Sequence, residues 1–439
     1  MATGPMARTE TARTAPTLTE RTAATQTEPT ARTRTEPTAP DPRPKLRHLK
    51  RLVGDEARFL ADHFGREAFR RRLPVGEASR LFSWDLLNRV LAQHRLGPPR
   101  LKLEQSGREV GREVFRERRP RPNQVLHDID VPALYEHLRG GATLILDGVN
   151  ELHPPLQRLA AGLAGEFCAS GQTNLYACWG ETQGFDVHWD DHDVFVIQVH
   201  GAKRWDLYGF TQPAPQRRGR QEPAPRPTYA PEQITLEAGD VLYLPRGYWH
   251  AALGLGGPSL HLTVGLSRKT GADLLHWLAD EAMLDDAVRA DLRLERDDAT
   301  LGAQVAQVLQ KMLARGDPAD LGRRYRRHVE ATRAYRPHLS FPDIGLAQVA
   351  LAPSTRLRLT DGASGVETRA DASAVVLSHR GVRYTLAAET GAVLHALVAG
   401  ESLSCAEIIA LCRPASERLA RDFIMEMLRQ GVLARETGE

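Results

Sequence analysis

The central part of the chain alternates short apolar runs with turns that contain glycine or proline. The runs "TNLYACW", "DVFVIQVHG", "KRWDLYG", "ITLEAGDVLYLPRG" and "SLHLTVGL" follow one another from Thr173 onward and are rich in β-branched and aromatic residues. Short strands separated by such turns are typical of an antiparallel barrel. The pattern therefore predicts a mainly β core, and the apolar run "ATLILDGV" predicts a further buried strand at its start.

Apolar residues at helical spacing flank this core. "FSWDLLNRVLAQ" predicts a helix with Ser83 as its cap, and "PPLQRLAAGLAGEFCA" predicts a helix with proline near its start. After Ser267, "GADLLHWLADEAMLDDAVRADL" and "LGAQVAQVLQKMLARG" predict a helical region. The Pro/Arg-rich run "TQPAPQRRGRQEPAPRP" (Thr211–Pro227) interrupts the strands and predicts a mobile surface loop.

The last ninety residues show a third pattern. "AVVLSHRG" and "VRYTLA" predict two short strands, and "TGAVLHALVAG", "SCAEIIALC" and "ERLARDFIMEMLRQG" predict three helices after them, an order that favours a small winged-helix module. The whole pattern predicts five segments: a disordered tail (1–45), a helical lead-in (46–140), a barrel (141–268), a helical region (269–340) and a winged-helix module (341–439).

Composition changes this picture mainly at the N-terminus. Residues 1–45 repeat Thr, Ala, Arg, Glu and Pro without an aromatic residue or isoleucine, so they cannot bury enough surface to offset their ordering entropy. Residues 1–50 hold nine Lys/Arg against five Asp/Glu, so the formal net charge of +3 leaves the rest of the 439-residue chain close to neutral. Such a balance gives no support for a direct nucleic-acid partner.

Cysteine usage and hydropathy predict where the protein works. The four cysteines form no C-x-x-C pair and are too sparse for a disulfide framework, which favours a reducing compartment. The sequence has no apolar run of the roughly 18 residues that a membrane span needs and no apolar signal core at its start. We therefore expect a cytoplasmic protein with no membrane partner.

One stretch concentrates the candidate chemistry. "GFDVHWDDHDVFVIQVHGAKRWDLYG" (184–209) places three histidines and five aspartates among residues typical of a strand, and burying such groups is unfavourable unless something pairs with them. In a strand, His188 and Asp190 point to the same side. "GDVLYLPRGYWH" supplies His250 about sixty residues later. Two imidazoles and one carboxylate form the facial triad of non-haem Fe(II), with three positions open for a chelating oxo acid and dioxygen.

Each part of this motif has a simpler explanation on its own. A single histidine on an apolar strand is more often a core residue than a ligand, and H-x-D recurs by chance, whereas the combination with the later motif is much rarer. Asp191, His192 and Asp193 are rival ligands. We expect Asp191 to face away from the site and His192 to form hydrogen bonds without binding the metal.

Two further histidines, His200 and His261, are expected to be structural.

These residues carry a family resemblance. The run from Val131 to Leu266 resembles the JmjC-type cupin oxygenases of the bacterial and nucleolar ribosomal-oxygenase group. The matching pieces are "GATLILDGVNELHPPLQRL", "TNLYACWGETQGFDVHWDDHDVFVIQVHGAKRWDLYG", "GDVLYLPRGYWHAAL" and "HLTVGL". The upstream run "FSWDLLNRVLAQHRLGPPRLKLEQSG" and the helical and winged-helix ends continue the order that is usual in this family, so the resemblance spans nearly everything after the tail.

The resemblance implies a double-stranded β-helix that binds Fe(II) and uses 2-oxoglutarate and O2 as co-substrates. His188, Asp190 and His250 match the metal triad of the family. Lys203, fifteen residues after His188, matches the basic residue that holds the distal carboxylate of 2-oxoglutarate, and a buried ammonium does need an anion.

Three further residues match family positions near the co-substrate. Asn174 and Tyr176 share one face of a predicted strand, and their amide and phenol groups can bond carboxylates. Thr263 is a candidate of the same kind. The alternative for all three is a buried polar residue with local partners.

The resemblance further implies hydroxylation of a side chain in a protein, such as a ribosomal protein, and a homodimer formed by the helices between about Ala272 and Gln310. A second hypothesis starts from "RYTLAAETGAVLHALVAGESLSCAEI", which resembles winged-helix domains that recognise leader peptides of ribosomally made natural products. The substrate would then be a precursor peptide. Demethylation of an N-methyl group is a neighbouring activity.

Two hypotheses outside this class are less favoured. A DNA-binding regulator with a cupin sensor needs a basic surface, but Gly381–Glu439 holds six Arg against eight Asp/Glu. A cupin that uses another metal for non-redox chemistry is disfavoured by the aspartate in the triad and by Lys203.

Overall fold

The computed structural model describes residues 46–217, 223–337, 339, 351–360, 363–369, 372–412 and 417–436. The predicted disordered tail lies outside these residues, as do positions 218–222 of the Pro/Arg-rich loop and most of the predicted start of the winged-helix module.

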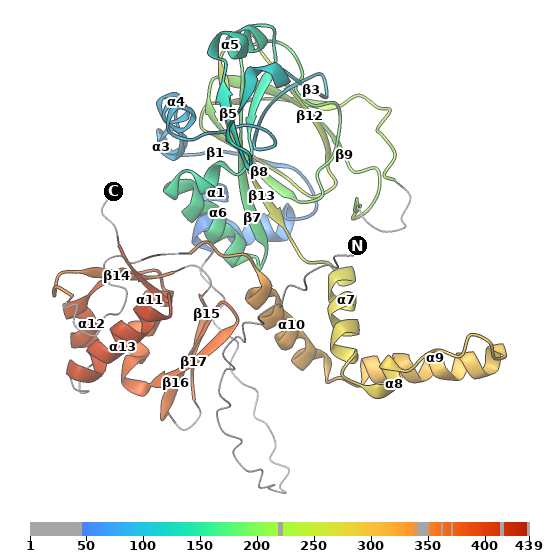
Figure 1. The fold of residues 1–439 in the computed structure, drawn as a ribbon, viewed down its shortest axis with the longest axis vertical. Helices are drawn as coiled ribbons and strands as arrows, with labels where there is room; N and C mark the ends of the chain where they lie inside the picture. The colour runs from blue at the N-terminus through green and yellow to red at the C-terminus, as the bar shows by residue number, and fades with distance from the viewer. Residues whose placement is uncertain are drawn as a thin grey trace, which may run out of the picture. The chain divides into compact units, whose positions relative to one another are not determined.

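Two antiparallel sheets form the barrel (Figure 1). The larger sheet has the strand order β1 (Phe69–Arg72), β11 (Asp240–Leu244), β8 (Asp193–His200), β13 (Ser259–Ser267), β7 (Ser170–Cys178), β6 (Thr143–Leu146), β2 (Leu101–Gln105) and β3 (Arg108–Val110). The smaller sheet has the order β10 (Glu232–Glu237), β9 (Ala202–Gly209) and β12 (Trp249–Gly254). The predicted mainly β core is therefore confirmed, and its larger sheet takes strands from the segment expected as a helical lead-in.

The burial of strand β8 explains its continuous apolar sequence. Phe195 and Ile197 belong to the large core that packs against the helices outside the barrel. Val194 and Val196 belong to a second core between the sheets, together with Trp205 of the smaller sheet. Because both faces of β8 are covered, the strand shows no alternation of polar and apolar residues.

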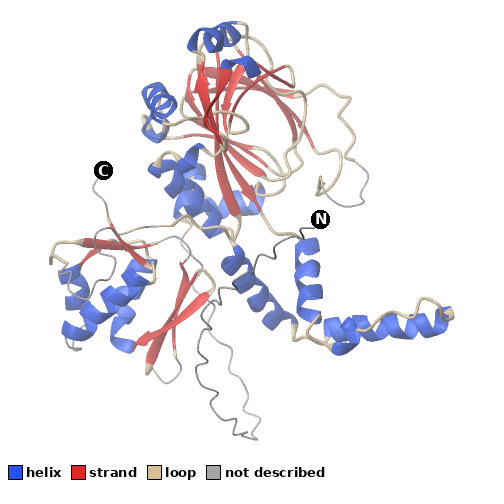
Figure 2. Ribbon diagram, in the orientation of Figure 1, coloured by secondary structure: helices blue, strands red, loops and turns tan. Residues whose placement is uncertain are grey.

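Helices cover the outer face of the larger sheet (Figure 2). The Ser83 side chain accepts a hydrogen bond from the Leu86 N–H and so caps α4, as the sequence predicts. The helix α6 begins with its two prolines and packs against β7. The helices of this part are α1 (Arg47–Val53), α2 (Glu56–Asp62), α3 (Glu77–Leu81), α4 (Trp84–Gln93), α5 (Val131–Arg139) and α6 (Pro154–Glu166), and a hairpin is formed by β4 (Phe115–Arg121) and β5 (Gln124–Ile129).

Three sequence predictions about local structure are corrected. The segment around His188 and Asp190 is no regular strand, because β8 begins only at Asp193 and His188 forms an isolated bridge. "ITLEAGDVLYLPRG" forms two strands, which Gly239 separates with a positive φ of 97°. The first helix after the barrel ends at Ala282, and a short second helix follows it.

The rest of the described chain consists of a helical region and a C-terminal module. The helical region holds α7 (Gly271–Ala282), α8 (Asp286–Arg289), α9 (Asp298–Leu313) and α10 (Pro318–Thr332). The module has its own apolar core. Its elements are β14 (Arg356–Leu359), β15 (Ala363–Thr368), β16 (Ala374–His379), β17 (Val382–Ala387), α11 (Gly391–Val398), β18 (Leu403–Ser404), α12 (Cys405–Leu411), α13 (Glu417–Arg429) and β19 (Leu433–Arg435). The winged-helix assignment stays a prediction.

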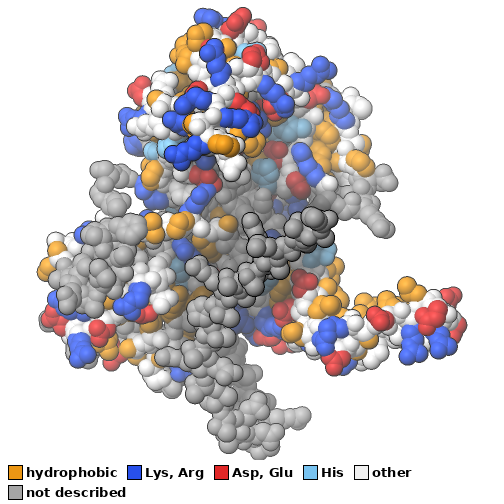
Figure 3. All heavy atoms as spheres, in the orientation of Figure 1, with side chains coloured by type: hydrophobic (Ala, Val, Ile, Leu, Met, Phe, Trp, Pro, Cys, Tyr) orange, Lys and Arg blue, Asp and Glu red, His pale blue; other side chains and the backbone are white. Residues whose placement is uncertain are grey.

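Acidic and basic side chains are interspersed over the face seen in Figure 3. Within the described residues, every helix is too short or too polar to cross a bilayer.

Asp193 fixes the start of β8 to two neighbouring strands. Its carboxylate is 1% exposed and accepts hydrogen bonds from the Tyr243 hydroxyl (2.9 Å) and the Arg246 N–H (3.2 Å). It also forms an ion pair with Arg268 at the end of β13. This carboxylate is therefore engaged in the scaffold, and it is not part of the cluster formed by the other candidate ligands.

We expect Asp193→Ala to lower the free energy of unfolding of the barrel by about 2–3 kcal/mol, because it leaves a partly buried arginine and a buried hydroxyl without their partner. Urea unfolding followed by tryptophan fluorescence measures the change. The control Asp422→Ala removes an exposed pair with Arg418 and should change the free energy by less than about 0.5 kcal/mol. Equal effects of the two substitutions would contradict this role of Asp193.

Candidate metal centre

A single antiparallel bridge brings two histidines together. The His188 N–H donates to the His250 carbonyl (3.1 Å), and the His250 N–H donates to the His188 carbonyl (2.8 Å). Bridge partners project their side chains to the same side of a sheet. The two imidazole centroids consequently lie 4.5 Å apart.

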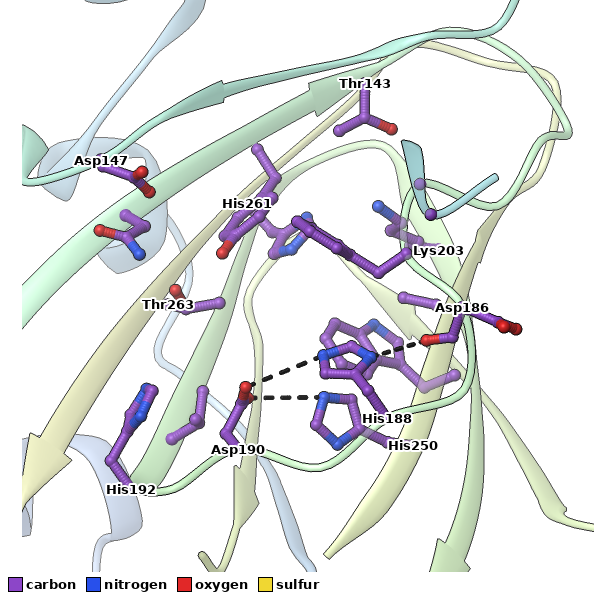
Figure 4. A pocket seen from close by; sticks show the side chains of 18 of the residues that line it. Thr143, Asp147, Asp186, His188, Asp190, His192, Lys203, His250, His261 and Thr263 are labelled. Carbon is purple, nitrogen blue, oxygen red and sulfur yellow. Dashed lines mark hydrogen bonds and ion pairs between the residues drawn. The ribbon is translucent and has the colours of Figure 1, made fainter. Parts of the chain in front are cut away.

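The carboxylate of the predicted triad comes from the loop that follows His188. The Asp190 carbonyl accepts a hydrogen bond from the Gly247 N–H (2.9 Å), which ties the loop to the Pro-Arg-Gly turn before β12. Gly247 has a φ of +86°, and a Cβ atom there would lie 2.4 Å from Pro215, so the turn needs glycine. The Asp190 carboxylate oxygens lie 3.8 Å from His188 Nε2 and 3.7 Å from His250 Nε2 (Figure 4).

The donor set fits a divalent metal ion. The ligand atoms of His188, Asp190 and His250 all lie within 4.8 Å of one another. The two N···O separations are too long for hydrogen bonds, whereas ligands at about 2.1 Å from one ion lie about 3–4 Å apart. The predicted triad thus comes together in space.

The backbone holds both imidazoles in the orientation that ligation needs. His188 Nδ1–H donates to the Asp186 carbonyl (2.7 Å), and His250 Nδ1–H donates to the Tyr248 carbonyl (2.8 Å). These bonds place the lone pair on Nε2, which faces Asp190. Burial and the neighbouring His188 lower the pKa of His250 to about 4, so its imidazole is neutral near pH 7. Burial opposes ionisation of Asp190, but His250, His188, His192 and Arg217 together outweigh it and lower the pKa of the carboxyl.

The three ligands lie in a cavity of about 470 Å³ at the barrel interior. All the other candidate site residues line it as well. Its lining residues are Lys102, Gly107, Thr143, Asp147, Asn174, Tyr176, Gly184, Phe185, Asp186, His188, Asp190, His192, Val194, Lys203, Trp205, Arg217, His250, Ala252, His261 and Thr263.

Lys203 lies on β9 with its side chain in this cavity. The residue is 4% exposed, and burial lowers the pKa of its ammonium. Among the described residues, the group that counteracts this shift is the Cys178 thiol, with no carboxylate in ion-pair contact. A buried lysine without an acidic partner indicates a site for an anion.

The three predicted co-substrate residues form part of one wall. Asn174 and Tyr176 on β7 pair with Thr263 and His261 on β13. The side chains of Asn174 and Thr263 lie near the Tyr176 hydroxyl and favour its ionised form. Burial, and after it the charge of Asp190, raises the pKa of Tyr176, so this hydroxyl keeps its proton. Their roles in binding a co-substrate stay a prediction.

Sequence reasoning missed His261, which it treated as structural. This residue is 3% exposed, lines the cavity and stacks on Tyr176 with centroids 4.9 Å apart. His261 and Thr263 are two residues apart on β13 and so face the same side of the sheet, which could have placed His261 in the site. His200, in contrast, is exposed at the end of β8 and contacts Trp84.

The described ends of the Pro/Arg-rich loop reach the mouth of the cavity. The Arg217 guanidinium lies 5.2 Å from the Trp189 ring centroid, and the Arg217 N–H lies 3.4 Å from an Asp191 carboxylate oxygen. Arg226 donates two hydrogen bonds to Asp186 (2.9 and 3.2 Å). Asp191 therefore contacts this loop and is not part of the ligand cluster.

Comparison with known proteins places this cavity in a known fold. Residues 152–274 match the family described as "JmjC domain". The chain is 26% identical over 244 residues to the protein named "Bifunctional lysine-specific demethylase and histidyl-hydroxylase NO66" of Drosophila persimilis, covering 55% of this chain and 34% of that protein. It is 32% identical over 176 residues to "Ribosomal oxygenase 1" of Rattus norvegicus, covering 38% and 29%. The chain thus spans about a third of the length of these relatives.

A solved structure shares most of the architecture. The ribosomal oxygenase YcfD of Escherichia coli superimposes with a TM-score of 0.55 at 18% identity, covering 87% of this chain and 98% of that one. A second structure of YcfD, described as a complex with cobalt and 2-oxoglutarate, gives a TM-score of 0.54 at 17% identity. At this identity the likeness shows the fold, which is of the cupin/JmjC type.

We expect Asp190→Ala to weaken Co(II) binding by more than about 100-fold, because the ion loses its anionic ligand. Loss of a group that only supports a ligand weakens metal binding by roughly 10- to 100-fold. A titration followed by the visible absorbance of Co(II) measures the affinity. Asp191→Ala, which removes the adjacent carboxylate, should leave the affinity within about threefold. Equal losses in the two variants would contradict this ligand set.

Proposed function

We propose that the chain is an Fe(II)- and 2-oxoglutarate-dependent oxygenase that hydroxylates a side chain of a protein or peptide, in keeping with the match of residues 152–274 to the JmjC domain. The observation that carries the proposal is one cavity that holds both a His-Asp-His cluster and a buried lysine that has no acidic partner in the described part of the chain. A 2-oxo dicarboxylate matches these two features, because its oxo-acid end chelates the ion and its far carboxylate neutralises the ammonium.

In the proposed reaction, bound Fe(II) and 2-oxoglutarate supply the oxidising chemistry, in which O2 oxidatively decarboxylates 2-oxoglutarate to succinate and one oxygen atom enters a substrate C–H bond. His188, Asp190 and His250 would hold the ion. Lys203 would neutralise the far carboxylate of 2-oxoglutarate.

The remaining lining residues orient the co-substrate and keep water away. Tyr176, Asn174 and Thr263 present neutral polar groups to the cavity. Trp205 and Phe185 lie beside the two imidazoles, with centroids 5.8 Å from His250 and 5.6 Å from His188. Their apolar surfaces limit access of water to the reacting groups.

We expect purified protein with Fe(II), 2-oxoglutarate and substrate to form succinate only when O2 is present. Lys203→Met should weaken 2-oxoglutarate binding by about 30-fold or more, because it removes the charge partner of a buried carboxylate. Calorimetric titration of the metal-loaded protein measures the affinity, and Lys269→Met is the control. A folded wild-type chain that binds neither Fe(II) nor 2-oxoglutarate would rule out the proposed function.

The charges near the cavity mouth favour hydroxylation over demethylation. Asp147 lies 3.4 Å from the Lys102 ammonium, and Asp186 is paired with Arg226. Arg217 adds a positive charge to the lining. A methylated lysine would bring another cation to a place where the acids outside the triad are already neutralised. A neutral or anionic target residue fits this surface better.

A protein substrate, such as a ribosomal protein, is supported by the names of the relatives. A precursor peptide is the second candidate, and the strand β17 favours it. In the described part of its sheet, β17 is an end strand that pairs with β16 on one side, and its Val382 is 51% exposed. A peptide can add a strand to such an edge.

Mass spectrometry of proteins and small peptides from a strain lacking this gene and from its parent separates the two substrates, since the target gains one oxygen atom.

We also propose a cytoplasmic location and no direct nucleic-acid partner. All four cysteines are free, as expected in a reducing compartment. Positive and negative side chains are mixed over the face in Figure 3, whereas binding to a duplex favours a basic surface.

We propose that the helical region forms a homodimer. Val305, Leu309 and Leu313 are spaced four residues apart on α9 and are 42%, 53% and 71% exposed. Leu275 on α7 is 56% exposed as well. Apolar residues that share one helix face and remain exposed indicate a protein partner.

We expect light scattering of the wild-type protein to give twice the chain mass of 48.6 kDa. Leu309→Asp should shift the protein toward the monomer, because a charge would be buried in the interface. Leu411→Asp, at an exposed leucine of the C-terminal module, is the control. A monomeric wild-type protein would contradict the dimer.

A further inference from the structure

Buried polar atoms without partners gather in the candidate site. Thr143 Oγ1, Trp205 Nε1 and His261 Nδ1 are buried and have no hydrogen-bond partner among the described residues, and all three residues line the same cavity. A buried polar group without a partner destabilises a folded protein by about 1–3 kcal/mol. Such groups in one cavity point to a polar ligand that satisfies them.

His261 is held more firmly than the other two residues. Its ring lies nearly parallel to the Tyr176 ring, at an angle of 7°, and its centroid lies 5.7 Å from that of the Trp205 ring in an edge-to-face arrangement. The register of β13 places it between Tyr176 on one side and Gln198 on the other. Stacking fixes the plane of the imidazole, which limits the directions in which Nδ1 can meet a partner.

Burial and the nearby Lys203 ammonium keep this histidine neutral. Burial, and after it the Lys203 ammonium, lowers the pKa of His261 well below its ordinary value. A neutral imidazole carries one N–H, which is a donor with a defined direction. The ammonium of Lys203, in contrast, is a point charge that neutralises an anion without fixing its orientation.

We propose that His261 is a positioning residue of the co-substrate subsite, whose Nδ1–H donates to the carboxylate that Lys203 neutralises. The inference rests on the proposed function and deepens it. A carboxylate has about four acceptor positions, so it can accept from Lys203 and His261 together. The subsite would thus select oxo acids that carry a second carboxylate at the far end.

The test compares ligands with and without that carboxylate. The protein is loaded with Zn(II), and calorimetry measures the affinities for 2-oxoglutarate and for 2-oxobutyrate, which keeps the chelating oxo-acid end only. His261→Phe retains the stacked ring and removes the donor. It should weaken 2-oxoglutarate binding by about tenfold, the effect of one hydrogen bond to a charged group, and leave 2-oxobutyrate binding within about twofold.

Two further variants sharpen the comparison. His261→Asn restores an N–H donor near the position of Nδ1 and should recover part of the affinity for 2-oxoglutarate. His200→Phe changes an exposed histidine of the neighbouring strand and should change neither affinity. In the ligand-free state, the unfolding temperature of His261→Phe should equal or exceed that of the wild type, because the substitution removes an unpaired buried group.

The outcomes distinguish failure of the proposed function from failure of the role proposed for His261. If the wild type fails to bind 2-oxoglutarate, the proposed function itself is wrong. If the wild type binds it and His261→Phe binds it equally well, the role of His261 is overturned while the proposed function stands. Equal loss of both ligands, or a lower unfolding temperature without ligand, would show that His261 only supports the fold.

Discussion

Two backbone hydrogen bonds between His188 and His250 decide where this chain can hold a metal ion. They join a loop to the start of β12, about sixty residues further along the chain, and place the two imidazoles side by side. The loop then has to supply only a carboxylate, and the bond from the Gly247 N–H to the Asp190 carbonyl positions it. Without this bridge, the same three side chains would not converge on one metal site. Asp193, three residues after Asp190, contacts Tyr243 and Arg268 of the larger sheet. These contacts hold the loop that carries the bridge against that sheet.

The two sheets contribute different groups to the cavity. His250 and Lys203 come from β12 and β9 of the smaller sheet and provide a metal ligand and a positive charge. The paired strands β7 and β13 of the larger sheet provide neutral groups with defined directions, from Asn174, Tyr176, His261 and Thr263. Because the outer face of the larger sheet packs against helices, these neutral groups are held on a rigid wall. A positive charge on one side and hydrogen-bonding groups of defined direction on the other suit a small anion that must bind in one orientation.

This cavity lowers the stability of the ligand-free barrel. Burial lowers the pKa values of Lys203, His250 and His261 and raises that of Tyr176. Burial therefore favours the neutral form of each group, and a group that stays charged destabilises the folded barrel. Two further polar atoms of the lining, Thr143 Oγ1 and Trp205 Nε1, have no partner among the described residues. The apolar cores on both faces of β8 offset this cost. The same groups that destabilise the empty barrel are those that a metal ion and an anion would satisfy, which is the usual conflict between stability and function at a binding site.

The sequence by itself determined the elements and most of the candidate chemistry. Strands, helix caps and the His-x-Asp and later histidine motifs depend on local spacing, and Lys203 was identifiable because a charge stood inside an apolar strand. Only the tertiary structure decided which polar residues share the cavity. His261 was expected to be structural and His188 was expected on a strand, yet pairing of β13 with β7 brings the first to Tyr176, and an isolated bridge holds the second. The physical reason is that strand pairing and its register depend on segments far apart in the chain, and no local pattern encodes them.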